Sequence, residues 1–129
     1  MVGKIDISKL KNPPEKHEFL VAKIFSEQGK NVTFIPASNI SGIHQPDFLI
    51  DGIRWELKSP KGSSKRTLQN NIHKAQSQSK NIIIDLHRIK LDEQKCISQI
   101  SFEFDKRRSI SEILIVTKKN KIIDLKRNR

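Results

Sequence analysis

Residues 46 to 58 read PDFLIDGIRWELK, and this stretch predicts a tight β-hairpin. Asp51 and Gly52 lie between two arms rich in β-branched and aromatic residues. This pair favours a type I′ turn, in which both central residues need positive φ. A two-residue turn sets the register of the arms, so that Phe48 faces Trp55. The stretch therefore predicts two antiparallel strands in a fixed register.

The two faces of this hairpin differ, because side chains alternate along a strand. One face is apolar and suits the core: Phe48, Ile50, Ile53, Trp55 and Leu57. The other face carries Leu49 and the charged side chains of Asp47, Arg54, Glu56 and Lys58. Asp47 and Glu56 would be direct cross-strand neighbours, with Cβ atoms about 5 Å apart. Two carboxylates at that distance repel each other unless something positive lies between them.

Two interpretations of the charged face follow. A bound Mg²⁺ or Mn²⁺ would make the opposed acids favourable, since both cations prefer carboxylate oxygens. Lys58 would then be within reach of an attacking water or a phosphate. Alternatively, the face is exposed to solvent and carries ordinary cross-strand ion pairs. The opposition of acid to acid, rather than acid to base, favours the metal site.

The composition indicates one domain that binds a polyanion. The chain has 129 residues, with 25 Lys and Arg against 14 Asp and Glu, a net charge of +11. Such a balance favours nucleic acid as the partner, ahead of an anionic membrane. No apolar run approaches the ~20 residues of a membrane span. Cys96 is the single cysteine, which excludes a disulfide framework.

The order of predicted elements gives the fold class. Apolar spacing and turn residues predict helices over 15–29, 66–80 and 92–107, strands over 31–36 and 81–89, the hairpin, and a closing hairpin over 112–125. This order predicts an α/β (α+β) fold, with a mixed sheet flanked by helices. We expect a single domain over residues 1–129, with a lead-in segment at 1–13 and a basic tail at 118–129.

Three of these features together resemble the PD-(D/E)XK nuclease superfamily. They are a helix that carries Glu18, the Pro-Asp pair at 46–47 and the WELK sequence at 55–58. Over residues 15–86 the chain looks like the C-terminal tRNase domains of contact-dependent growth inhibition toxins and related polymorphic toxins. The resemblance implies a restriction-endonuclease-like core.

The resemblance also implies a divalent metal, Mg²⁺ or Mn²⁺ in preference to Zn²⁺. Its ligands would be the carboxylates of Glu18, Asp47 and Glu56 and the backbone carbonyl of Leu57. Lys58 would orient or activate water. Asp51 is a less favoured alternative to Asp47, because it lies at the turn itself.

The helix predicted over 66–80 and the loop before it carry basic and amide side chains. Such side chains suit contacts with phosphates and nucleobases. The candidates are Lys61, Lys65, Arg66, Gln69, Asn70, His73, Gln76 and Lys80. His73 is a second candidate for acid or base catalysis. The alternative is that this side of the helix is simply solvated.

The expected activity is phosphodiester hydrolysis, with RNA, and tRNA in particular, favoured as substrate. A 2′-hydroxyl attack that gives a cyclic phosphate is also open. The alternatives are a DNase of the same fold and a non-catalytic basic domain that binds nucleic acid. A toxin would act in the cytoplasm of a target cell and would have a cognate immunity protein.

Overall fold

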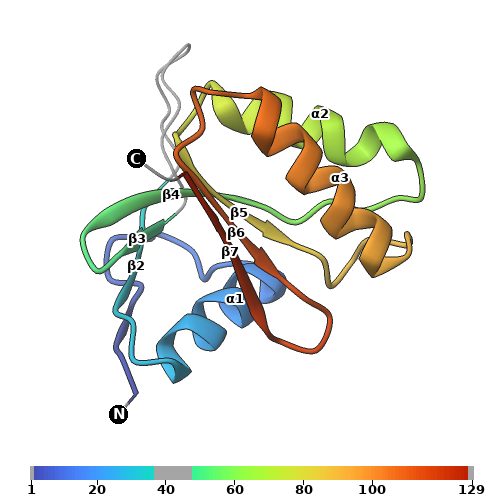
Figure 1. Ribbon diagram of the computed structural model, residues 1–129. Helices are drawn as coiled ribbons and strands as arrows, with labels where there is room; N and C mark the ends of the chain where they lie inside the picture. Colours follow the sequence, from blue (N-terminus) through green and yellow to red (C-terminus); the bar gives the residue numbers. More distant parts are fainter. Residues whose placement is uncertain (1, 37–47, 128–129) are drawn as a thin grey trace.

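The computed structural model describes residues 2–36 and 48–127. Within them, seven strands form one mixed sheet and three helices cover its two faces (Figure 1). The elements are β1 (Ile5–Asp6), α1 (Lys16–Glu27), β2 (Val32–Phe34), β3 (Phe48–Ile50), β4 (Ile53–Lys58), α2 (Lys65–Gln76), β5 (Asn81–Asp85), α3 (Glu93–Lys106), β6 (Glu112–Val116) and β7 (Ile122–Lys126). This arrangement confirms the predicted α/β fold class.

The strands lie in the sheet in their sequence order, from β1 to β7. The central strands β4, β5 and β6 run parallel to one another, and α2 and α3 make the two crossovers between them. The β2–β3, β3–β4 and β6–β7 pairs are antiparallel, whereas β1 adds to β2 in parallel. Because β4 and β5 are parallel, their carboxyl ends meet at the same edge of the sheet.

The predicted hairpin is confirmed in its register and in its turn. Phe48 pairs with Trp55 across β3 and β4, as expected from a two-residue loop. Asp51 and Gly52 have φ of 49° and 85°, which is the positive backbone conformation that a type I′ turn requires.

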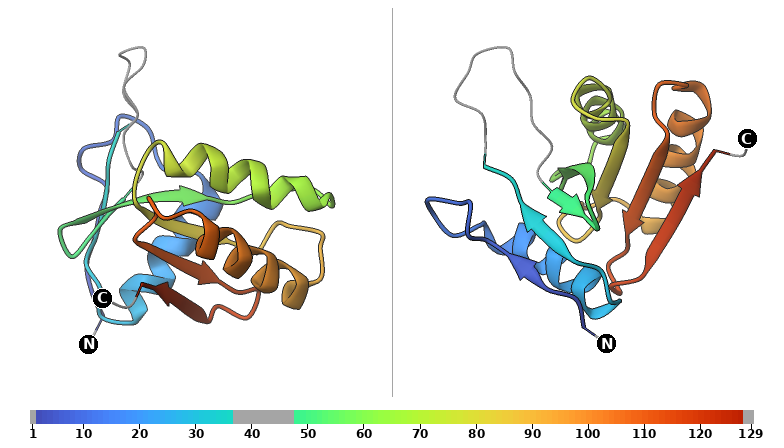
Figure 2. Two further views of the ribbon diagram at one scale, coloured as in Figure 1. Left: turned by 45° about the horizontal axis from the view of Figure 1, so that its top comes forward. Right: turned by 90° about the vertical axis from the view of Figure 1, so that its left-hand side faces the viewer.

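Two apolar cores form, one on each face of the sheet. Figure 2 shows α1 on one side of the sheet and α2 and α3 on the other. Ile83 of β5 packs into the core beneath α1, and its neighbours Ile82 and Ile84 pack into the core beneath α2 and α3. A strand buried on both faces reads as a continuous apolar run, and this explains the run of isoleucines in β5.

Two predicted segments end earlier in the structure than expected. The strand expected over 81–89 ends at Asp85, where polar side chains begin to bond to one another. The helix expected over 66–80 ends at Gln76, because the Ser77 hydroxyl donates to the Lys74 carbonyl at 2.8 Å and competes with the helical pattern.

The lead-in segment and the basic tail are partly built into the sheet. Within the lead-in, Ile5–Asp6 pair with β2 as β1. Within the expected tail, residues 118–121 form the turn of the closing hairpin, and Ile122–Lys126 form the edge strand β7. In the part of the chain that the structure describes, no helix is long and apolar enough to cross a membrane.

Candidate active site

The carboxyl end of β4 carries an acid and a base that lie inside the protein. Lys58 Nζ is 3.2 Å from Glu56 Oε2, and the two side chains are 20% and 5% exposed. The interpretation of this face as fully solvated is therefore wrong for these two residues. A buried carboxylate loses several kcal/mol of hydration, so its retention needs a reason.

The alternation of β4 decides which face this pair occupies. Glu56 and Lys58 are in register with Ile82 and Ile84 of β5, whose side chains belong to the core beneath α2 and α3. Trp55 lies on the opposite face, in the core beneath α1. β4 is hydrogen-bonded to a strand on each side, so the pair is held on a rigid part of the fold.

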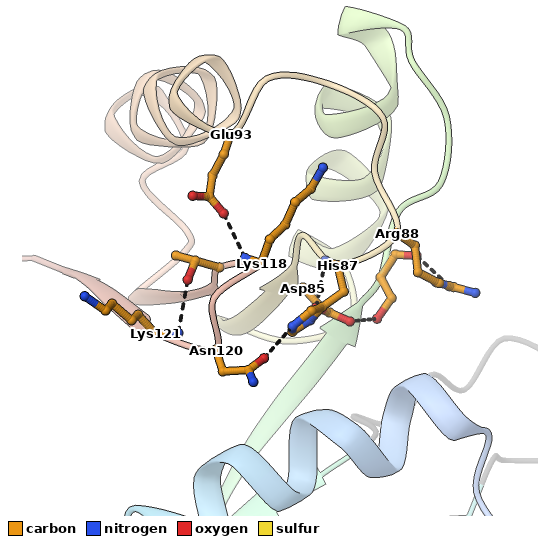
Figure 3. A network of polar contacts seen from close by, with 9 residues as sticks. Asp85, His87, Arg88, Glu93, Lys118, Asn120 and Lys121 are labelled. Carbon is orange, nitrogen blue, oxygen red and sulfur yellow. Dashed lines mark hydrogen bonds and ion pairs between the residues drawn. The ribbon is translucent and has the colours of Figure 1, made fainter.

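A polar network begins one residue after Lys58, at the same edge of the sheet (Figure 3). Asp85, at the end of β5, is fully buried. Its Oδ2 accepts from the Ser59 hydroxyl at 3.0 Å, and its Oδ1 accepts from the backbone N–H of His87 at 3.1 Å. His87 Nδ1 also lies 2.5 Å from Asp85 Oδ1. Asp85 thus joins the ends of two parallel strands.

The network extends in two directions from Asp85. On one side, His87 Nε2 is 2.6 Å from Oδ1 of Asn120, in the turn between β6 and β7. On the other side, Arg88 extends away from His87 and donates through Nη2 to the Ser59 carbonyl at 2.6 Å (Figure 3). The sequence pattern does not mark Asp85, His87 and Arg88 as site residues, because it predicts one continuous strand over 81–89.

The loop after β4 is paired with the segment after β5. Gly62 and Ile89 form an isolated parallel bridge, and the Lys90 N–H donates to the Gly62 carbonyl at 2.8 Å. Gly62 has a φ of +119°, a conformation that L side chains rarely adopt. Residues 59–62 and 88–90 therefore lie side by side at the carboxyl edge of the sheet, and we call this pair of segments the double segment.

The structure separates the other predicted acids from Glu56, as far as it describes them. Asp47 lies outside the described residues. Glu18 is in the first turn of α1, on the opposite face of the sheet from Glu56, and its Oε1 accepts from the Glu15 N–H at 3.0 Å as part of a capping box. Asp51 accepts from the Asn31 N–H at 2.9 Å, which gives this alternative acid a structural task at the turn.

The residues predicted to bind nucleic acid lie mostly on the surface. Lys61, Lys65, Arg66, Gln69, Asn70, His73 and Lys80 are exposed, and Gln76 is half-buried. His73 Nδ1 is 3.4 Å from a guanidinium nitrogen of Arg107, next to α3. This part of α2 therefore faces α3 and solvent, and the structure does not bring His73 to the Glu56–Lys58 pair.

The donor atoms near Glu56 suit a hard cation. Its carboxylate and the backbone carbonyl of Leu57 are oxygen donors of the kind that Mg²⁺ and Mn²⁺ prefer. Among residues 2–36 and 48–127, no group of three or more His, Cys, Asp or Glu side chains could hold a metal ion by itself. A complete ligand set at Glu56 therefore depends on Asp47 and remains a prediction.

A second pair of acids lies on the α1 face, away from Glu56. Glu112 and Asp124 line a cavity of about 370 Å³ together with Lys30, Trp55 and Lys126. Burial, a hydrogen bond with Asp124 and the negative charge of that residue raise the pKa of Glu112 to about 7, against the opposing effect of Lys126 and Lys30. Glu112 therefore holds its proton to a higher pH than an ordinary exposed glutamate does.

Comparison with known proteins gives a family and a fold. The family model described as "Contact-dependent growth inhibition CdiA C-terminal domain" matches residues 44–122, more than half of the chain. The solved "CdiA-CT/CdiI toxin and immunity complex from Burkholderia pseudomallei" is similar with a TM-score of 0.69 and 17% sequence identity, and the match covers 97% of this chain and 100% of that chain. At this identity the likeness shows the fold alone. The search of curated proteins gave no match.

Proposed function

Because this chain belongs to the family of CdiA C-terminal domains of contact-dependent growth inhibition, we propose that it is a toxin domain that hydrolyses RNA. tRNA is the favoured substrate, because the chain resembles tRNase toxin domains. The observation that carries the proposal is the Glu56–Lys58 pair, with Nζ and Oε2 at 3.2 Å on the central strand β4.

The chemistry of this pair suits phosphodiester cleavage. A phosphoryl centre under attack by water gains negative charge on its oxygens, and a fixed ammonium in a site of low dielectric stabilises that charge. Lys58 is largely withdrawn from solvent, so it would meet this charge with little competing water. Water would add to phosphorus as the bond to the leaving nucleoside oxygen breaks, and the proton lost by the water would balance the one gained by the leaving group.

A divalent metal fits this proposal through its donors. Glu56 and the Leu57 carbonyl would hold Mg²⁺ or Mn²⁺, with Asp47 as the further predicted ligand, whereas the Glu18 carboxylate caps α1. Such an ion would polarise the scissile phosphate and lower the pKa of a bound water. The position of the pair also agrees with the general rule that ligands bind beyond the carboxyl ends of parallel strands.

The surface charge suits RNA as the partner. Exposed Lys and Arg side chains on the loop before α2 and on α2 itself would contact phosphates whatever the RNA sequence. The similar solved chain belongs to a structure described as a toxin and immunity complex. We infer that this domain also has a cognate immunity protein, acidic where it meets the basic surface, and that the toxin acts in the cytoplasm of a target cell.

Cleavage of a substrate panel tests this proposal. Total tRNA, ribosomal RNA and duplex DNA would be incubated with the wild type in Mg²⁺, Mn²⁺ or EDTA. We expect metal-dependent cleavage of tRNA, which Lys58→Ala slows by about 100-fold or more. Arg54→Ala is the matched control, since Arg54 lies on the same strand face but is exposed, and it should cleave like the wild type.

Each other outcome of the panel has a defined meaning. Preference for duplex DNA would replace the RNase with a DNase of the same fold. Binding of all three nucleic acids without any cleavage would leave a basic binding domain and refute the enzyme. Cleavage at full rate by Lys58→Ala would show that the catalytic residues do not lie on β4.

A further inference from the structure

Arg88 carries a buried hydrogen-bond donor for which the described part of the chain offers no partner. Its Nη2 donates to the Ser59 carbonyl at 2.6 Å, but its Nε is buried and has no hydrogen-bond partner among residues 2–36 and 48–127. Among the residues that the structure describes, no carboxylate pairs with this guanidinium. A buried donor without a partner costs about 1–3 kcal/mol, so this arrangement calls for an explanation.

Arg127 shows what a structural arginine looks like in the same chain. Its Nε donates to the Ile110 carbonyl at 2.8 Å, and its Nη2 donates to the carbonyls of Phe104 and Arg107. The guanidinium also lies 4.1 Å from the centroid of the Phe104 ring. Arg127 therefore ties the end of β7 to α3, whereas the residues that the structure describes hold Arg88 at one nitrogen.

The position of Arg88 places its guanidinium beside the candidate active site. The carbonyl that it contacts belongs to Ser59, the residue that follows Lys58 in the chain. Lys61 and Lys90, both exposed, lie in the same double segment of residues 59–62 and 88–90. The segment thus gathers positive charge at the edge of the sheet where β4 and β5 end.

The buried Asp85 holds this position in place. One of its carboxylate oxygens binds the Ser59 hydroxyl, and the other binds the backbone and ring of His87. The carboxylate therefore fixes the residue before Arg88 and the residue that Arg88 contacts. Such fixing means that little conformational entropy is lost when Arg88 takes up a ligand.

We propose that Arg88 binds a phosphate group of the nucleic-acid substrate, next to the phosphate that Lys58 meets. A guanidinium suits phosphate, because its parallel N–H groups match two phosphate oxygens and the charge strengthens both bonds. The phosphate would satisfy Nε, and Asp85 acts as the positioning residue. This assignment of a substrate contact rests on the proposed function, whereas the existence of an anion site at Arg88 does not.

The direct test is the Nε–H signal of Arg88 in a ¹⁵N–¹H NMR spectrum of the wild-type protein. Inorganic phosphate is titrated first, and then a single-stranded RNA whose 2′-O-methyl groups resist cleavage. We expect the Arg88 signal to shift and saturate with both ligands. The Arg127 signal is the internal control and should stay in place, because its Nε is already bonded.

The outcomes separate the anion site from the nuclease. If neither ligand moves the Arg88 signal, or if Arg127 moves equally, the proposal is overturned. A shift with phosphate but not with RNA would show an anion site that the substrate does not use, which overturns the assignment to the substrate. Because both ligands are read without turnover, a chain that cleaves nothing could still show the Arg88 site.

A binding measurement adds a quantitative check. In a Lys58→Ala background, Arg88→Gln should weaken tRNA binding by about 10-fold and reduce the slope of log K against log salt by about 1. Arg88→Lys should recover part of the affinity. Equal affinity and slope in Arg88→Gln, with its melting temperature unchanged, would contradict the proposed contact.

Discussion

The protein buries two glutamates, and they differ in what surrounds them. Glu103 of α3 is bonded to Arg107 Nε at 2.9 Å and lies 3.5 Å from Lys106 Nζ, so its partners come from the next turn of its own helix. Glu56 of β4 meets the ammonium of Lys58 at 3.2 Å on one face of a strand. The first arrangement closes a helix end. The second leaves an acid and a base together where two parallel strands end.

This comparison indicates which pair serves stability and which serves chemistry. The guanidinium of Arg107 is fixed by Glu103 near the end of α3, far along the chain from the carboxyl ends of β4 and β5. Around Lys58, by contrast, Ser59, Asp85 and Arg88 add a network at the edge where parallel strands end. We expect substitutions at Glu103 to change stability alone and those at Glu56 to change activity.

The largest expected change in stability comes from removing the partner of Glu103. In Arg107→Ala, the buried carboxylate of Glu103 keeps Lys106 but loses its bonded guanidinium. We expect the free energy of unfolding to fall by about 3 kcal/mol. Urea unfolding measures this loss. tRNA cleavage below the melting temperature should stay within about twofold of the wild type, because Arg107 bonds to Glu103 and lies beside His73, where α2 meets α3. A strong loss of cleavage in a folded Arg107→Ala protein would break the comparison.

Replacing each buried pair by neutral side chains sharpens the difference. Glu56→Gln combined with Lys58→Met removes two desolvated charges and should raise the free energy of unfolding by about 1–2 kcal/mol, because an apolar replacement of a buried pair is often stabilising. Glu103→Gln with Arg107→Met is the matched control. It should lower the free energy of unfolding, because the end of α3 loses its bonded guanidinium. A loss of stability in the β4 variant as large as that in the α3 variant would give Glu56 a structural role too.

The smallest effect is expected at Glu112, and it depends on pH. The pKa of Glu112 is about 7 in the folded protein, against an ordinary value of 4.5. The folded state therefore holds the proton more tightly, and this contribution to stability is lost as pH rises toward 7. At pH 8, Glu112→Gln should be more stable than the wild type by about 1 kcal/mol, after allowance for screening by water.

Thermal unfolding across pH checks this expectation. The difference between Glu112→Gln and the wild type should vanish near pH 4, where the carboxyl is protonated in both states. Glu27→Gln, at an exposed position, should show no such trend. A stabilisation of Glu112→Gln that is equal at pH 4 and pH 8 would refute the raised pKa of Glu112.

The hairpin could be predicted from the sequence because its determinants are local. Asp51 and Gly52 fix the turn, and strict alternation then fixes which side chains share a face. The placement of Glu56 and Lys58 on one face follows from the same rule. Their burial does not, since it depends on α2 packing over β4 and on the pairing of β4 with β5.

The remainder of the site depends on contacts between distant segments. Asp85, His87 and Arg88 follow an apolar run without a Gly or Pro, so nothing local marks the end of the strand. Ser59 and Arg88 are brought together only by the crossover through α2. Similarly, the side of α2 that carries His73 could be assigned to α3 only once the packing of the two helices was known.

One measurement tests the central claim most directly. Single-turnover cleavage of tRNA in Mg²⁺ would be compared for Glu56→Gln and Glu103→Gln, with the melting temperature of each protein. We expect Glu56→Gln to keep its melting temperature and to lose at least about 100-fold in rate, whereas Glu103→Gln should melt earlier and cleave at the wild-type rate. Cleavage by Glu56→Gln at the wild-type rate would contradict a catalytic role for Glu56.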